Sequence, residues 1–104
     1  MVTLNEFITN NVKILYALGF YIMEGHKPRK QMNATNKIIE TFTKSVPCPY
    51  SITYMFENPN SEEYIMVEFM NDGTCAMRIP TANEMNEYID YQIKLDEGKT
   101  NDAH

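Results

Sequence analysis

The sequence of 104 residues lacks the features of a membrane-spanning or fibrous chain. It has no tryptophan and only four glycines, and no apolar run approaches the roughly 18 residues that a membrane-spanning helix needs. The first residues, MVTLNEFITNN, lack the basic start and apolar stretch of a signal peptide, so we expect a cytoplasmic protein without membrane contact. A chain of this length holds one hydrophobic core, and 43% apolar and 22% charged residues are typical of a globular domain.

Residues that carry catalysis or hold metals are equally scarce. The two histidines, His26 and His104, lie far apart, and Cys48 and Cys75 match none of the usual zinc-ligand spacings. We expect both cysteines to be reduced and buried as small apolar side chains. The four glycines stand apart, so no glycine-rich loop could cradle a phosphate. A nucleophile pair of Cys48 with His26 has no evident third member, and we expect neither enzymatic activity nor a cofactor.

The N-terminal segment predicts a helix with a marked start and stop. Thr3 and Glu6 form a capping box, and Gly19 suits the left-handed residue that follows a helix. Apolar residues at helical spacing predict its buried face: Leu4, Phe7, Ile8, Val12, Leu15 and Leu18. The apolar run at residues 20–23 fits either a strand or a helix extension, and residues 24–28 break the pattern as a loop.

A second helix is predicted over residues 29 to 45. Its buried stripe consists of Ile38, Ile39 and Phe42. Seven residues make nearly two turns, so lysines at that spacing line up along the other side. These lysines are Lys30, Lys37 and Lys44.

Residues 50 to 80 alternate in polarity with a period of two, which predicts a three-stranded antiparallel meander. Side-chain parity decides the length of its second turn. A two-residue turn would place Arg78 opposite Val67, on the core side. A three-residue loop over residues 71–73 instead pairs Phe69 with Cys75, with Gly73 as the left-handed residue. We therefore expect the three-residue loop.

Thr81 and Glu84 form a second capping box, which starts a C-terminal helix that Gly98 should end. Its predicted buried face holds Met85, Tyr88, Ile89 and Ile93. The order of elements is that of an α+β domain: N-terminal helices, a three-stranded antiparallel meander and a C-terminal helix, with the helices on one face of the sheet. We expect a single domain over residues 1–98 and a frayed C-terminal tail over residues 99–104.

The net charge of −5 conceals an asymmetry along the chain. Residues 1–50 hold six Lys or Arg and three Glu, whereas residues 51–104 hold three Lys or Arg and eleven Asp or Glu. Such an asymmetry indicates a polarised interaction surface. The acidic half is densest in the predicted C-terminal helix, whose candidate partner-binding residues are Glu84, Glu87, Asp90, Asp96 and Glu97.

The polar side of the predicted sheet is a second candidate contact, because flexible methionines suit adaptable binding surfaces. Its candidate residues are Met55, Tyr64, Met66 and Met70. Coverage by the N-terminal helix, or by a second copy of the chain in a homodimer, would explain the same pattern. Glu68 and Arg78 are diagonal neighbours in the expected register and should form a surface ion pair.

The basic half supports an alternative: a nucleic-acid-binding or regulatory protein that uses the lysine-lined face of residues 27–44. The candidate phosphate contacts are Lys27, Arg29, Lys30, Lys37 and Lys44. The scarcity of arginine, with two in the chain, and the interruption of the stripe by Glu40 weigh against this alternative.

The composition also bears on the origin of the gene. Phe, Tyr, Met, Ile, Asn and Lys account for 48 residues, against 16 for Gly, Ala, Arg and Pro, and AT-rich codons favour the first group. We therefore expect a low-GC genome, such as that of a phage or a plasmid. With the acidic surface, this favours a small non-catalytic protein-binding module, a phage or mobile-element accessory protein that inhibits a host nucleic-acid-handling or defence factor.

Overall fold

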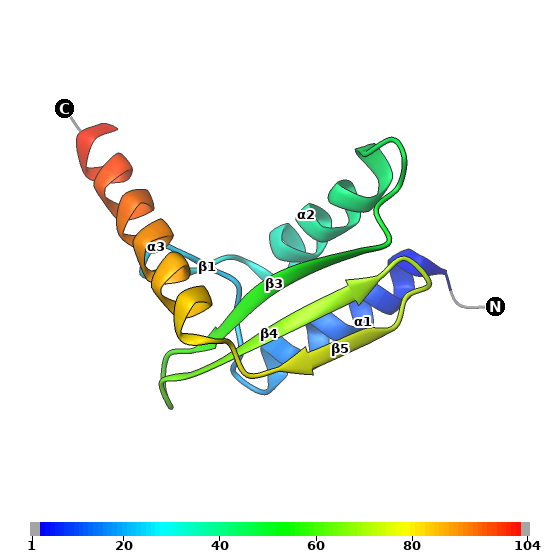
Figure 1. Cartoon of the computed structure of the whole chain (residues 1–104), viewed down its shortest axis with the longest axis horizontal. Helices are drawn as coiled ribbons and strands as arrows, with labels where there is room; N and C mark the ends of the chain where they lie inside the picture. Colours follow the sequence, from blue (N-terminus) through cyan, green and yellow to red (C-terminus); the bar gives the residue numbers. More distant parts are fainter. Residues whose placement is uncertain (1–2, 103–104) are drawn as a thin grey trace.

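The structure of the protein is a computed structural model that describes residues 3–102, with side chains over residues 3–98. The elements in chain order are α1 (Leu4–Ala17), β1 (Met23–Glu24), β2 (Lys27–Pro28), α2 (Gln31–Lys44), β3 (Ser51–Asn58), β4 (Glu63–Met70), β5 (Cys75–Arg78) and α3 (Ala82–Asp102). Figure 1 shows α1 and α2 against the three-stranded sheet, and α3 rising from one end of it. The predicted α+β architecture is confirmed: N-terminal helices, an antiparallel meander and a C-terminal helix.

The sheet has the order β3-β4-β5, and both pairings are antiparallel. Phe69 pairs with Cys75 and Val67 with Met77, which confirms the three-residue loop over residues 71–73. Gly73 has φ 93°, a value that a glycine adopts without strain. The register places the apolar side chains of all three strands on one face of the sheet.

The hydrophobic core lies between this face and the helices α1 and α2. Its fully buried side chains come from these three layers: Ile8, Val12, Leu15, Ala34, Ile38, Phe42, Phe56, Val67 and Phe69. Phe56 and Phe69 pack with their ring centroids 6.3 Å apart. Among the side chains that the structure describes, none from α3 belongs to this core.

α1 starts after Thr3 of the predicted capping box and ends at Ala17, with Leu18 as its C-cap and Gly19 as the left-handed residue that follows. The Glu6 amide donates to the Thr3 hydroxyl at 3.2 Å, and Gly19 has φ 91°. Leu18 was expected to be buried, but it is 65% exposed because it follows the last turn, where the chain reverses. Phe7 also stays partly exposed, because its ring lies over the Gly73 turn at the rim of the core.

The chain between α1 and α2 forms more regular structure than expected. Tyr21 makes an antiparallel bridge with Glu57 of β3, so the apolar run 20–23 joins the sheet edge at one position. The predicted loop at residues 24–28 is wrong, because β1 and β2 form a small hairpin in which Glu24 pairs with Lys27. Gly25, with φ 68°, and His26 make its two-residue turn.

α3 departs furthest from the sequence prediction. It continues through Gly98 to Asp102, so Gly98 does not end it. Ile89 and Ile93 were expected to be buried, but they are 44% and 49% exposed. The frayed tail was expected over residues 99–104. The backbone of residues 99–102 belongs to α3, whereas their side chains and all of residues 103–104 lie outside the described part.

Candidate functional site

α3 is joined to the rest of the protein by a row of polar side chains four residues apart. This docking row consists of Glu84, Tyr88, Gln92 and Asp96. Four residues advance a helix by little more than one turn, so the row stays on one side of α3. Each member contacts a residue outside the helix, so hydrogen bonds attach α3 where the core does not.

The first contact fixes the beginning of α3. Arg78 of β5 donates one hydrogen bond to each Glu84 carboxylate oxygen, both at 2.6 Å. The Thr81 amide donates to Glu84 Oε1 at 2.9 Å, which completes the predicted capping box. Hydrogen bonds from Arg78 and then from Thr81 lower the pKa of the Glu84 carboxyl to about 2. The predicted Glu68–Arg78 ion pair is wrong, because Arg78 turns to Glu84 while Glu68 accepts from Ser51 at 2.7 Å.

Tyr88 fastens the next turn of α3 to the sheet. Its hydroxyl donates to Glu57 Oε1 at 2.8 Å, and its ring packs edge-on against Tyr64 with centroids 6.1 Å apart. Burial, followed by the hydrogen bond to the Glu57 carboxylate, raises the pKa of Tyr88 well above its usual range. Glu57 and Tyr64 lie on the polar side of the sheet, so α3 contacts the face opposite the core. The expectation that all helices share one face is therefore wrong.

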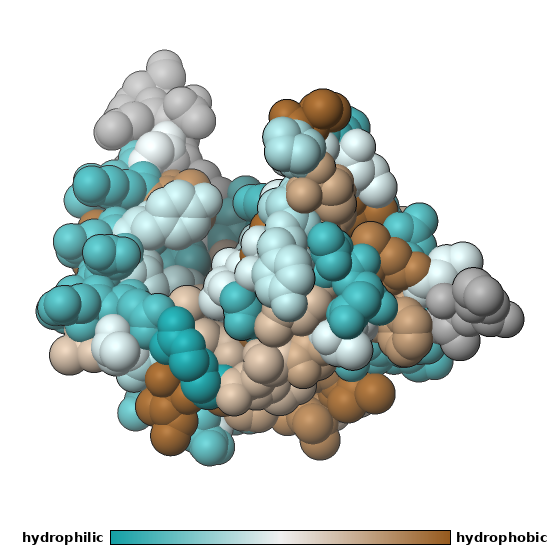
Figure 2. All heavy atoms as spheres, turned by 45° about the vertical axis from the view of Figure 1, so that its right-hand side comes forward, coloured by the Kyte–Doolittle hydropathy of each residue, from teal (hydrophilic) through white to brown (hydrophobic). Residues whose placement is uncertain are grey.

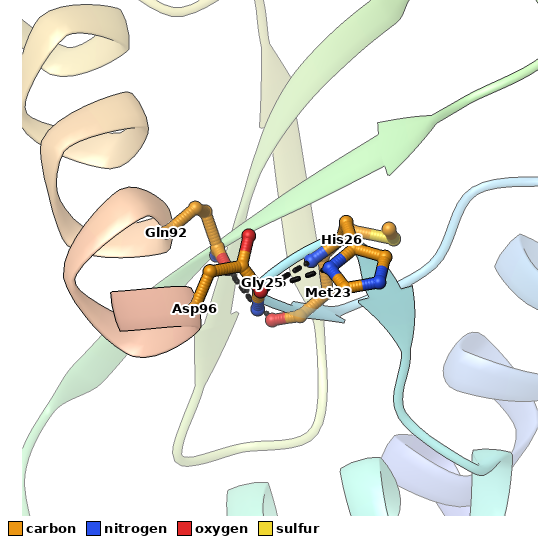
Figure 3. Close-up of polar contacts among 5 residues, drawn as sticks. All are labelled: Met23, Gly25, His26, Gln92 and Asp96. Carbon is orange, nitrogen blue, oxygen red and sulfur yellow. Dashed lines mark hydrogen bonds and ion pairs between the residues drawn. The ribbon is translucent and has the colours of Figure 1, made fainter. Parts of the chain in front are cut away.

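The last two members of the row hold the β1–β2 hairpin (Figure 3). The Gly25 amide donates to Gln92 Oε1 at 2.6 Å, and Gln92 Nε2 donates to the Met23 carbonyl at 3.3 Å. The Asp96 carboxylate accepts from the His26 amide at 3.3 Å and lies 2.9 Å from its ring Nδ1. A Cβ at position 25 would overlap the Asp96 carboxylate, so this approach requires glycine. His26 therefore acts as a structural contact.

The predicted acidic strip divides into two groups. Glu84 and Asp96 belong to the docking row and hold β5 and the hairpin. Glu87, Asp90 and Glu97 are exposed. Only this second group is available to a partner.

Two isoleucines lie exposed among these carboxylates. Ile89 and Ile93 are one helical turn apart, and Asp90 and Glu97 lie within one turn of Ile93. The outer face of α3 comprises Glu87, Ile89, Asp90, Ile93, Lys94 and Glu97, with Glu87 and Ile89 at its opposite margins. It combines apolar and mainly acidic side chains that the described part of the protein leaves exposed.

The polar side of the sheet keeps its methionines half-buried. Met55, Met66 and Met70 are partly accessible, whereas the Tyr88 ring contacts Tyr64. α1 packs on the opposite face, so the expectation that the N-terminal helix covers this side is wrong. A shallow hollow of about 160 Å³ lies beside Met66, next to Arg78.

The candidate phosphate contacts lie in different surroundings. Lys27 in β2 and Lys30 before α2 are exposed. Lys44, at the end of α2, lies 3.6 Å from Glu40 one turn earlier and forms an exposed ion pair with it. Three of the five cations therefore lie at the surface, whereas Arg29 and Lys37 are half-buried.

Arg29 and Lys37 line a hollow of about 220 Å³ between α2 and α3, which Figure 2 shows as a recess between the largely hydrophilic α3 and the rest of the protein. The other residues that line this cationic hollow are Ile22, Met23, Thr53, Tyr54, Met55, Tyr88, Tyr91 and Gln92. Burial, and then the charge of Arg29, lowers the pKa of Lys37. The sequence indicates these two cations but carries no signal of the hollow, because the walls of the hollow come from four separate segments.

The cysteines and histidine form no common centre. Cys48 is exposed in the loop after α2, so its predicted burial is wrong, and Cys75 is only partly buried against the core. Burial raises the pKa of the Cys75 thiol. Neither Cys48 nor His26 lines the cationic hollow. Among the side chains of residues 3–98, no three His, Cys, Asp or Glu residues gather into a group that could hold a metal ion.

Comparisons of the chain with protein-family models, with curated proteins and with solved structures find no match. Within the part of the chain that the structure describes, no helix combines the length and apolar character needed to cross a membrane.

Proposed function

We propose that this protein is a non-catalytic binding protein that engages another protein through the outer face of α3. One observation carries the proposal: α3 lies outside the hydrophobic core and exposes Ile89 and Ile93 among three carboxylates. Protein interfaces combine an apolar centre with a polar rim, and an uncovered apolar pair bordered by charges has that composition.

The docking row makes this face a preformed surface. Its contacts are spread over four successive turns of α3, from Arg78 at the start to His26 near the end. A helix held in place before binding loses less conformational entropy when a partner arrives. The attachment therefore favours recognition of α3 as a rigid helix.

The chemistry of the outer face defines the partner. Three carboxylates and one lysine, Lys94, around two isoleucines give the face a net negative charge, which fits a basic groove with an apolar floor, in which a helix can lie. Grooves that hold nucleic acid are basic, because they must neutralise phosphates. The proposed partner is accordingly a host nucleic-acid-handling or defence factor, which the protein inhibits by occupying that groove. The half-buried methionines Met55, Met66 and Met70, with Tyr64, supply a second, adaptable contact.

Charge reversal tests this proposal. The variant carrying Glu87→Lys and Asp90→Lys is compared with a control carrying Glu62→Lys and Glu63→Lys, which makes the same charge change at two exposed positions, the last residue of the β3–β4 turn and the first of β4. Immobilised protein captures partners from an extract of the native host. We expect the α3 variant to lose a partner that the control keeps, with an association rate reduced roughly tenfold or more at low salt.

Two further measurements make the outcome decisive. Circular dichroism must show that both variants keep the native fold, and duplex DNA or heparin should displace the captured partner if its groove is basic. Equal capture by both variants would refute the role of the outer face. Binding of DNA by the protein itself, lost when Lys30, Lys37 and Lys44 are changed to Ala, would support the nucleic-acid-binding alternative instead.

A further inference from the structure

The cationic hollow lies along the free edge of β3. β4 pairs with β3 over its whole length, whereas on the other side the described residues provide a single bridge, from Tyr21 to Glu57. The hollow is lined by Tyr54, which lies on the core face, and by Thr53 and Met55, which lie on the polar side. A hollow lined from both faces of one strand is located at the edge of that strand.

Backbone groups of β3 point into this edge. The Glu57 amide donates to the Tyr21 carbonyl at 2.9 Å, and the Glu57 carbonyl accepts from the Tyr21 amide at 2.8 Å. Outward-pointing groups recur at every second residue of an antiparallel strand, so the N–H and C=O of Thr53 and Met55 point the same way. Among the described residues these groups have no backbone partner. An unpaired edge of this kind is a template for another strand.

The charges beside this edge select the strand that would bind. Arg29 lies 4.0 Å from Glu24, at the limit of an ion pair. Lys37 has no acidic side chain within 4.0 Å in the described part of the chain. Glu24 also acts electrostatically on Lys37, so the two half-buried cations share one carboxylate, which leaves a net positive charge on the α2 side of the edge. The α3 side is lined by the rings of Tyr88 and Tyr91.

We propose that the free edge of β3 binds an extended acidic peptide as an added strand. The peptide backbone pairs with Thr53 and Met55, and a carboxylate side chain reaches Arg29 and Lys37. Alternate side chains of a strand point to opposite faces, so the neighbouring residues of the peptide lie against the tyrosines of α3 and are apolar. At about 220 Å³ the hollow is below the 300 Å³ or more that is typical of small-molecule sites, and it suits one or two side chains.

This site is separate from the outer face of α3. Tyr91, which lines the hollow, and Ile93, on the outer face, are two residues apart and so about 200° apart around the helix. The proposal therefore does not depend on the proposed function, and charge reversal at Asp90 alone, on the Ile93 side of α3, should leave peptide binding unchanged.

Two matched peptide pools test the proposal. Each pool consists of seven-residue peptides in which every second position is fixed, as Glu in one pool and as Gln in the other, with Val, Leu and Tyr mixed at the remaining positions. NMR spectra of the ¹⁵N-labelled protein record amide shifts and hydrogen exchange on addition of each pool. We expect the Glu pool to shift the resonances of Thr53, Met55 and Lys37 and to slow exchange of the first two amides.

A charge-matched pair of variants on α2 provides the control. Lys37→Gln should weaken binding of the Glu pool about tenfold, as expected for a lost hydrogen bond to a charged group. Lys44→Gln removes the same charge outside the hollow and should leave binding unchanged. Equal binding of both pools, or equal effects of both variants, would refute the charge recognition. Shifts at Lys37 without slower exchange at Thr53 and Met55 would indicate an anion pocket. The absence of any shift at these three residues would refute the site. Either result overturns the added strand.

Discussion

The attachment of α3 can be tested by adding one methyl group at its contact with the hairpin. In Gly25→Ala the new Cβ would overlap the Asp96 carboxylate and lie 2.9 Å from its Cγ, at a residue with φ 68°. The Asp96 side chain must rotate away, which breaks its hydrogen bonds to the amide and the ring of His26. The substitution therefore acts on the docking of α3 and leaves the core unchanged.

The expected cost follows from two contributions. A non-glycine residue in the left-handed region costs about 1–2 kcal/mol. Two solvent-accessible hydrogen bonds, each at about 0.5–1 kcal/mol, add a similar amount. The backbone strain stays in the hairpin when α3 opens, so only the lost hydrogen bonds, about 1–2 kcal/mol together, raise the opening equilibrium of α3, by about 5-fold to 30-fold.

Hydrogen exchange measures this opening directly. Amides of α3 should exchange faster by that factor in Gly25→Ala, whereas the amides of Val67 and Phe69 in the core strand β4 should keep their rates. Gly98→Ala is the matched control, since a Cβ there has no atom within 4 Å and Ala in a helix adds up to about 1 kcal/mol. Unchanged exchange in α3 would refute the docking row, and equal acceleration in β4 would show that α3 and the core unfold as one unit.

Further predictions follow from the core, the titratable groups and the thiols. Phe56→Ala should lower the free energy of unfolding by about 3–5 kcal/mol, measured by urea denaturation, because its ring is fully buried. The pKa of Glu84 lies near 2 in the folded state, so its contribution is present above about pH 4.5 and lost as pH falls towards 2; Glu84→Gln should flatten the melting temperature over that interval. Because folding raises the pKa of Tyr88, this group contributes to stability below about pH 10, and the contribution is lost as the pH rises above that value. Tyr88→Phe should therefore make the fall in stability between pH 10 and 11 shallower. One proton accounts for a slope of roughly 1.4 kcal/mol per pH unit, and the change should be only part of this slope because solvent screens the half-exposed phenol. Cys48 should react with a thiol reagent before Cys75, and Cys48→Ser should remove the fast phase, because only the Cys75 thiol is partly buried.

The sheet could be predicted because one physical rule governs it. Side chains alternate between two faces, so a shift of the pairing by one residue would have placed Arg78 against Val67 in the core. That cost selected the three-residue loop, which the structure confirms through the pairing of Phe69 with Cys75. The predictions of helix starts at Thr3 and Thr81 were correct for a similar reason, because each capping box involves residues only three positions apart.

α3 could not be predicted in the same way, because apolar spacing identifies a stripe without showing what covers it. Met85, Tyr88, Ile89 and Ile93 formed a plausible stripe, yet the sheet offers α3 a polar side at Glu57 and Tyr64. The helix therefore turns its row of polar residues inward and leaves the isoleucines outside. Polar residues four positions apart are ordinary on exposed helices, so the docking row carried no signal of its own.

The candidate site was predictable only in its components. The sequence predicts Lys37 and Arg29 as phosphate contacts, but the surroundings of these two side chains depend on where the chain places β3 and α3. The hairpin turn at Gly25 brings Gln92 and Asp96 of α3 next to β1 across some 70 positions of sequence, and this closure creates the second wall of the hollow. No local pattern encodes a contact of that range.

The docking of α3 links the two proposed binding surfaces. Tyr91 borders the cationic hollow and Ile93 lies on the outer face, so one rigid helix positions both. A substitution that releases α3 removes one wall of the hollow and the fixed orientation of the outer face together. Gly25→Ala should therefore weaken both peptide binding at β3 and partner capture, although residue 25 belongs to neither surface. Lys37→Gln should affect only the first, and charge reversal at Asp90 only the second. If Gly25→Ala weakened one interaction and spared the other, the spared surface could not depend on a docked α3, and its assignment would have to be rejected.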